Sequence, residues 1–286
     1  MDVPEGPADP ETSSTAQAAT GEQGLHGAAE HPFAAKGARG GGTGSTLMTL
    51  HGGGVLVTNA TTAIFWGPEW SNATFAGDKI TGLDSFFGGF GGSRYAGLST
   101  EYAGSDGRTV TAVSTYAGHV LDTSAAPSKA PSTSAAVAEA CKITNNNPDP
   151  NGLYLLYTST GAGHVSYCAW HSWGTCSNGA AVQVAYMPNI DGLAGCDPGD
   201  TYGTGHSQGL AAVANVTAHE LSETITDPRG AGWFDAGGAE NGDKCAWTFG
   251  GAVTLSNGSR WKLQQEWSNA AYTATSGTPT GCLQGQ

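Results

Sequence analysis

Charged residues are scarce in this chain of 286 amino acids, and basic residues are the scarcest. Only 12% of the residues are charged, and 11 Lys and Arg stand against 24 Asp and Glu, which gives a formal net charge of −13. Nucleic acids and anionic membrane surfaces both require a basic footprint, so we expect neither as a partner. No apolar run approaches the roughly 20 residues that span a bilayer. An ordinary domain is about a quarter charged, so this composition favours a secreted, extracellular protein.

The chain has no C-x-x-C pair, which argues against a cysteine-based metal site. Its six cysteines all lie in the second half, and an even number in a secreted protein favours disulfides. Six cysteines allow fifteen connectivities, and the spacing alone does not choose among them. The pairing we expect is Cys168–Cys196, Cys245–Cys282 and Cys141–Cys176. The N-terminus shows no basic and apolar signal segment, so we expect the numbering to start after a removed signal.

Residues 1–45 lack apolar periodicity and are rich in Gly, Pro and polar residues. Such a segment buries too little surface to offset its ordering entropy. We therefore expect a disordered leader or a propeptide remnant, with His26 and His31 in solvent. Residues 46–286 are expected to form a single domain of catalytic type.

The second region carries patterns of both strands and helices. Residues 132–143 and 209–226 have caps and helical spacing, and residues 78–103 indicate two short helices. Apolar, β-branched or aromatic runs predict strands, and a closing antiparallel pair is expected within 244–267. The expected strands are 54–67, 108–118, 152–160, 164–170 and 181–188. The fold class is therefore α/β (α+β), with a mixed, twisted sheet and a disulfide-stabilised second half.

The segment TAHELSETITDP, residues 217–228, concentrates the chemistry. A helix advances about 100° per residue, so His219, Glu220, Glu223 and Asp227 share one face. Acidic residues near a helix C-terminus are disfavoured by the dipole, and like charges four residues apart repel. A bound divalent cation would reverse both effects. The alternative is a solvated acidic face on which the charge of Arg229 offsets that of Asp227.

The H-E-x-x-E form of this segment is similar to the H-E-x-x-H motif of zinc peptidases. In that motif the residues at i and i+4 bind zinc and the intervening Glu activates water. We expect His219 and Glu223 as ligands and Glu220 as the catalytic base. A carboxylate is a harder ligand than imidazole, so Zn²⁺ is favoured but Ca²⁺ or Mn²⁺ stays open.

A catalytic zinc also needs a third protein ligand. Asp227 and Glu240 are the main candidates, because Pro228 disfavours helical geometry at Asp227 and Glu240 lies 21 residues after His219. The loop after the helix also offers Asp235 and Asp243. His171 and His164, on or beside the preceding strands, are further alternatives.

Residues 205–209, GHSQG, match the G-x-S-x-G motif of serine hydrolases. That motif requires a buried strand directly before the serine, and the preceding CDPGDTYGT is polar. After Ser207 only His219 is available, and it lies on the same helix. We therefore expect Ser207 to cap the helix rather than to act as a nucleophile.

Three blocks, GGGVLVTNATTAIFWGPEW, YCAWHSWGTC and HELSETITDP…GWF…AENGDKCAW, resemble the EXORDIUM or phosphate-induced protein 1-like family of secreted proteins. The resemblance runs from about residue 50 to the C-terminus. Its microbial branch carries H-E-x-x-E-x-x-T-D-P and resembles zinc-dependent peptidases, which implies roles in the site for His219, Glu220, Glu223 and Asp227. Plant members keep a Glu near position 240 without the helix motif, which implies that Glu240 has a structural role or supports the ligands from beside them rather than binding the ion.

These observations predict a secreted, zincin-like metallopeptidase acting on protein or peptide substrates. The competing prediction is a non-catalytic extracellular module that binds glycan or protein and holds a structural ion. Its glycan would stack on tryptophans, for which the candidates are Trp66, Trp70, Trp170, Trp173, Trp261 and Trp267.

Overall fold

The computed structural model describes residues 26–27, 30–36, 47–199, 202–274 and 281–286. In these residues a seven-stranded mixed sheet has the order β1-β7-β8-β6-β4-β5, and β2 also pairs with β7. Strands β5, β4, β6 and β8 are parallel, whereas β7 is antiparallel to β8, and β1 and β2 are antiparallel to β7. The bounds are β1 His26–Gly27, β2 His31–Ala34, β4 Asn59–Trp66, β5 Ser114–Asp122, β6 Gly152–Thr158, β7 Tyr167–Thr175 and β8 Ala181–Met187. The expected mixed sheet is confirmed.

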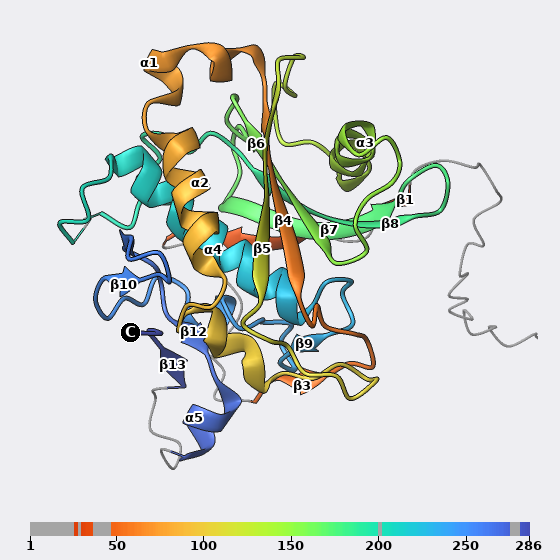
Figure 1. Cartoon of the computed structure of the whole chain (residues 1–286), viewed down its shortest axis with the longest axis vertical. Coiled ribbons are helices and arrows are strands. Elements are labelled where there is room, and N and C mark those ends of the chain that lie inside the picture. The colour runs from red at the N-terminus through yellow and green to blue at the C-terminus, as the bar shows by residue number, and fades with distance from the viewer. Residues whose placement is uncertain (1–25, 28–29, 37–46, 200–201, 275–280) are drawn as a thin grey trace, which may run out of the picture.

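The sheet lies between two helical layers (Figure 1). Helices α2 (Lys79–Phe90) and α4 (Gln208–Thr226) pack on one face, and α3 (Thr133–Ile143) packs on the other. Side chains alternate between these layers with the period of two that strands impose. On β4, Phe65 joins the core beneath α2 and α4, whereas Ile64 joins the core beneath α3. The central strand β6 is buried along its whole length, which fits its uninterrupted apolar sequence.

Helix α4 begins where the sequence predicts. Ser207 is its N-cap, and its side-chain oxygen accepts a hydrogen bond from the backbone N–H of Leu210 at 3.1 Å. Every residue from Leu210 to Thr226 is buried. The polar side chains on this helix must therefore find partners inside the protein, since water does not reach them.

Three disulfides brace the second half, with the pairing expected from the sequence: Cys141–Cys176, Cys168–Cys196 and Cys245–Cys282. They close loops of 35, 28 and 37 residues, and a loop of about 30 residues contributes roughly 3–4 kcal/mol in the chain-entropy account. Two of them hold β7 or the residue that follows it. Disulfides of this kind persist in oxidising surroundings such as the extracellular space.

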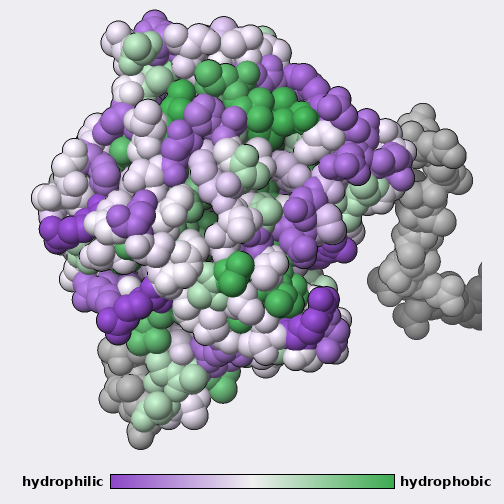
Figure 2. Space-filling view, in the orientation of Figure 1, coloured by the Kyte–Doolittle hydropathy of each residue, from purple (hydrophilic) through white to green (hydrophobic). Residues whose placement is uncertain are grey.

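Short elements complete the described chain. The β10–β11 hairpin is the closing antiparallel pair expected within 244–267. Figure 2 shows a face that is mostly polar or neutral, with hydrophobic residues in separate patches. No helix among the described residues is long and apolar enough to cross a membrane. The remaining elements are η1 Pro68–Ser71, α1 Ala73–Ala76, η2 Ala96–Glu101, η3 Asp243–Cys245, α5 Asn269–Ala274, β3 Thr49–Leu50, β9 Trp233–Phe234, β10 Val253–Thr254, β11 Arg260–Trp261, β12 Glu266–Trp267 and β13 Cys282–Leu283.

Part of the leader is ordered against the sheet. Residues 26–27 and 31–34 are strands paired with β7, although a disordered leader or propeptide remnant was expected over residues 1–45. His31 is only partly exposed rather than a solvated tail residue. The pairing explains the difference, because β7 supplies the partner groups that the polar leader cannot supply to itself. Apart from residues 26–27 and 30–36, the leader lies outside the described residues.

Candidate metal centre

The helical face expected from the sequence is present, and it faces inward. His219 and Glu220 are 0% exposed and Glu223 is 1% exposed. The separation of four residues brings Nε2 of His219 to 3.0 Å from Oε1 of Glu223. The expected alternative of a solvated acidic face is therefore excluded for these three side chains.

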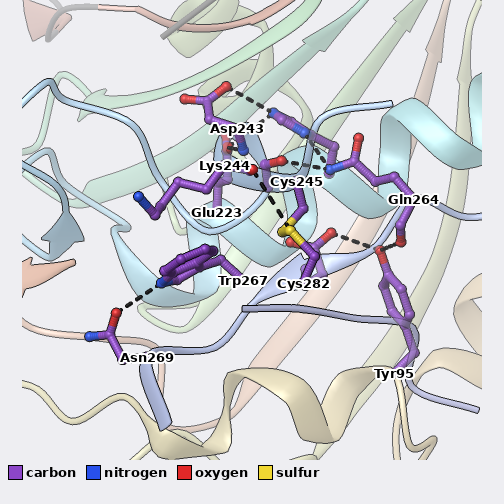
Figure 3. Close-up of a disulfide and its surroundings, with 12 residues drawn as sticks. Tyr95, Glu223, Asp243, Lys244, Cys245, Gln264, Trp267, Asn269 and Cys282 are labelled. Carbon is purple, nitrogen blue, oxygen red and sulfur yellow. Dashed lines mark hydrogen bonds and ion pairs between the residues drawn. A yellow bond between two sulfur atoms is a disulfide. The ribbon is translucent and has the colours of Figure 1, made fainter. Parts of the chain in front are cut away.

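Asp243 joins this pair from the loop that follows the helix. Its Oδ1 lies 3.7 Å from Nε2 of His219, and its backbone N–H donates a hydrogen bond of 2.9 Å to Oε1 of Glu223. One ligand atom from each of His219, Glu223 and Asp243 lies within 4.8 Å of the others, so the three could hold one metal ion. Asp243 begins the short helix η3, which Cys245 ties to β13. Figure 3 shows Glu223 and Asp243 close to this disulfide.

His171 approaches the same helix from β7. Its Nδ1 lies 3.2 Å from Oε2 of Glu220 and 3.6 Å from Oε2 of Glu223. The two carboxylate oxygens of Glu223 therefore face different histidines, Oε1 facing His219 and Oε2 facing His171. These residues form a second group that could hold a metal ion: His171, Glu220 and Glu223.

Glu240 belongs to a third group. Its Oε2 lies 3.6 Å from Nε2 of His171 and 3.3 Å from Nδ1 of His31. His31 comes from β2, and its ring stacks on that of His171 with centroids 5.0 Å apart. Glu240 thus lies at the site, but His219 is not in its group.

Asp227 has a different position from the one expected of a ligand. It is the C-cap of α4, and its Oδ1 accepts hydrogen bonds from the backbone N–H groups of Ala231 and Gly232 at 2.8 and 2.7 Å. These bonds fix the turn that follows Pro228. Asp227 is buried, but it is in none of the three groups.

The buried acids are held in an environment that disfavours their charges. Burial, followed by repulsion from Glu223 and Asp243, raises the pKa of Glu220 well above its usual value. Burial and the neighbouring carboxylates raise the pKa of Asp243 to about 7. Burial lowers the pKa of His219 to about 4 and that of His171 well below its usual value. Without a cation, burial therefore favours the protonated form of these carboxyls and the neutral form of these imidazoles.

Several of these buried atoms have no hydrogen-bond partner. They are Nε2 of His219, Nε2 of His171, Oε1 of Glu220 and Oε1 of Glu240. Buried polar atoms without a partner cost free energy, and a cation is the partner that carboxylate oxygens and imidazole nitrogens share. The donor set therefore fits a divalent metal ion.

Two residues outside the three groups position His219. A Cβ on Gly242 would lie 2.7 Å from Nδ1 of His219 and 3.0 Å from Oε1 of Glu223, so only glycine fits there. The Gln264 side-chain amide lies 3.0 Å from Nδ1 of His219 and also donates to the Gly242 carbonyl at 2.9 Å. The two contacts of the Gln264 amide fix the orientation of the His219 ring. Gln264 lies beside Glu223 and Asp243 in Figure 3.

Sequence reasoning did not find all of these residues. It offered Asp243 only as one of several loop acids, although its position three residues after Glu240 was visible. Gln264 and Gly242 carried no sequence signal, because their roles depend on contacts with His219 that the fold creates. His31 carried none either, since it lies in a polar leader. His164 lies outside the three groups.

Ser207 caps α4, as predicted. The last sheet strand before it, β8, ends at Met187, so the strand that a serine-hydrolase nucleophile requires directly before the serine is missing.

The tryptophans proposed as glycan-stacking residues are largely in the core: Trp66, Trp70, Trp170, Trp261 and Trp267 are at most 8% exposed. They pack the interior, and only Trp173 of that set is partly exposed.

No family model matches the chain, and no curated protein or solved structure matches it significantly. The site is therefore defined by its own side chains. It is a buried group of carboxylates and histidines that could hold a metal ion, placed between one helix and the edge of a mixed sheet.

Proposed function

We propose that this protein is a secreted, zincin-like metallopeptidase that hydrolyses peptide bonds. The observation that carries the proposal is the convergence of His219 and Glu223 with Asp243, while Glu220 lies on the same helical face. The spacing matches the arrangement in which i and i+4 bind the metal and the residue between them activates water. The resemblance to the microbial H-E-x-x-E branch supports the same function.

Zinc is the ion we favour. An imidazole with two carboxylates is an accepted zinc donor set, and three protein ligands leave a position for substrate or water. Calcium prefers six to eight oxygen ligands, and His219 in the first group counts against it. A zinc ion in this position would act as a Lewis acid on the peptide carbonyl and on the attacking water.

The roles of the chain's own residues follow from their positions. His219, Glu223 and Asp243 would hold the ion, and Gln264 would fix the ring of His219. Glu220 would take a proton from the attacking water and pass it to the leaving amine, once the charge of the bound ion favours its deprotonated form. His171, whose Nδ1 lies 3.2 Å from Glu220, would orient that carboxylate. Asp227 would fix the end of the helix, and Glu240 would remain beside His171.

The test uses metal analysis and a protease assay on the same protein. We expect about one zinc per chain by mass spectrometry, and digestion of casein that a chelator abolishes and zinc restores. Glu220→Gln should retain the metal and lower turnover by about a hundredfold or more, since one general base contributes about 10²–10⁴ in rate. Glu101→Gln, an exposed carboxylate on η2, is the matched control and should behave like the wild type. Full turnover in Glu220→Gln would refute the mechanism.

One observation favours the second candidate function, a binding module with a structural ion. His219, Glu220 and Glu223 are enclosed, as the ligands of structural ions are, and a substrate cannot reach them in this state. Bound zinc together with intact casein, in every variant, would select this function. The segment that encloses the site therefore matters for the choice between a peptidase and a binding module.

A further inference from the structure

The cover over the site is a piece of the leader, residues 31–36. Its strand β2 runs antiparallel along β7, with His31 opposite His171, Phe33 opposite Ala169 and Ala34 opposite Tyr167. Beyond the strand, the backbone N–H of Ala35 donates to the Ser166 carbonyl at 2.8 Å. The segment is therefore held largely through its backbone, along the edge of the sheet that faces the candidate site.

One side chain of this segment is inserted into the site. Phe33 is 0% exposed, and its ring stacks on that of His219 with centroids 3.6 Å apart and on that of Trp247 at 4.9 Å. Its backbone also lowers the pKa of the Glu220 carboxyl, against the larger effect of burial. Phe33 thus contacts both a proposed ligand and the proposed base.

The next residue is also held by its backbone. The indole N–H of Trp247 donates to the Ala34 carbonyl at 3.1 Å, and the backbone N–H of Lys36 donates to the Gly195 carbonyl at 2.6 Å. Backbone hydrogen bonds along a sheet edge, with a pocket for one side chain, are the way in which an extended peptide is recognised by strand addition.

The other walls of the site are tied more firmly than β2. Strand β7 is held by Cys168–Cys196, and η3 is held by Cys245–Cys282. The end of α4 is fixed by the two hydrogen bonds to Asp227. The pairing segment of β2 is four residues long and includes Pro32, which has no N–H and is tolerated only at sheet edges. Among these walls, β2 is the one whose release costs least.

We propose that the β7 edge above α4 is a binding groove for an extended peptide with an aromatic side chain, and that residues 31–36 occupy it as an intramolecular pseudosubstrate. The groove between His219 and Trp247 is the subsite for the aromatic ring. Displacement of the segment opens the site to peptides in trans. The inference names the substrate class of the proposed peptidase and rests on that function, but peptide binding is measurable without turnover.

The test measures binding of a peptide to the full-length protein. The probe is a fluorescein-labelled peptide with the sequence of residues 30–36, EHPFAAK, followed by anisotropy in the zinc-loaded Glu220→Gln background so that the probe is not cleaved. Adding Phe33→Ser weakens the internal segment, and we expect the probe to bind about ten- to a hundredfold tighter, as the loss of one buried phenyl ring in cis implies. Val113→Ser, which removes an exposed apolar side chain outside the segment, is the control and should bind like the parent.

A second peptide, EHPSAAK, checks the aromatic subsite and should bind at least about tenfold more weakly than EHPFAAK. Equal binding of both peptides, or equal binding of EHPFAAK by the Phe33→Ser protein and its parent, would overturn the inference. If Phe33→Ser does not fold, a specific-protease site inserted between Arg39 and Gly40 of the Glu220→Gln protein replaces it. After cleavage, excess EHPFAAK should displace residues 1–39 on gel filtration, and a leader that stays bound would overturn the inference equally.

Casein digestion separates this inference from the proposed function. Phe33→Ser in the otherwise native protein should digest casein about ten- to a hundredfold faster than the wild type, with zinc required in both. Tighter peptide binding without casein cleavage in either protein would support the peptide-binding groove and refute the peptidase function. Zinc-dependent casein cleavage at the same rate in both proteins, with no gain in peptide binding, would support the peptidase function and refute the role of residues 31–36 as a pseudosubstrate.

Discussion

Gly242→Ala tests whether the geometry around His219 matters for metal binding. A Cβ at this position would lie 2.7 Å from Nδ1 of His219, closer than real Cβ contacts allow, and 3.0 Å from Oε1 of Glu223, which is tighter than most of them. Both side chains are enclosed, so neither can swing away freely. His219 or the η3 loop must therefore move by several tenths of an ångström. Overpacking of this kind costs about 1–3 kcal/mol, which lowers the melting temperature by roughly 2–10 °C in a domain of this size.

The same movement separates the ligand atoms of His219 from those of Glu223, so zinc affinity should fall at least about tenfold, as it does when residues that orient a ligand are altered. The assays are thermal unfolding by circular dichroism with chelator and zinc titration by calorimetry. Gly97→Ala is the control, since a Cβ there meets nothing within 4 Å. The Gly97→Ala control should keep wild-type stability and zinc affinity. If Gly242→Ala also kept both, the ligand geometry described for His219 would be wrong.

Two further predictions follow from the positions of the acids. Asp243→Asn should lower zinc affinity, measured by calorimetry, by at least about tenfold. Asp227→Asn should instead lower the free energy of unfolding, measured in urea, by about 1–3 kcal/mol and change zinc affinity by no more than a fewfold. The zinc-free protein should lose stability as the pH rises from about 7.5 to 9, because burial raises the folded-state pKa values of Glu220 and Glu223 well above their unfolded values and that of Asp243 to about 7. Below about pH 7.5 His219 opposes this trend, because its pKa is lowered to about 4 in the folded state while its unfolded form still takes up a proton near its usual pKa. Zinc should weaken the loss of stability, since it binds the deprotonated carboxylates; a chelated protein whose melting temperature rises from about pH 7.5 to 9 would contradict the pKa directions.

The parts of the site that the sequence predicted are local. The face shared by His219, Glu220 and Glu223 follows from helical geometry, and the cap at Ser207 follows from one side chain and the N–H of Leu210. The sheet and its helices were likewise predicted from periodicity. Their ends were less accurate: the strand expected from residue 54 begins at Asn59, because the backbone N–H of Leu56 bonds to the Ile225 carbonyl at the end of α4 instead of joining the sheet.

The parts that the sequence did not predict depend on contacts between distant segments. The choice between Glu240 and Asp243 is made by η3, which directs Asp243 toward His219 and leaves Glu240 beside His171. Asp227 was a reasonable ligand candidate, but the turn after Pro228 uses its carboxylate for two backbone N–H groups. Phe33 has no local reason to be ordered, because its strand pairs with one more than 130 positions further along the chain.

The charge of the cluster and its enclosure depend on each other. Burial makes the carboxylates costly, and the same burial strengthens their attraction to a cation, since Coulomb interactions grow as the local dielectric falls. Phe33 covers the ring of His219 and Glu220 at once, so the segment that excludes water from the centre also blocks peptides from it. A permanently closed centre of this composition would suit a structural ion. A catalytic centre must open, and β2, unlike the walls formed by β7, η3 and the end of α4, has neither a disulfide nor a capping carboxylate to hold it in the part of the chain that the structure describes. Whether β2 moves therefore decides between the two functions that the same ligands allow.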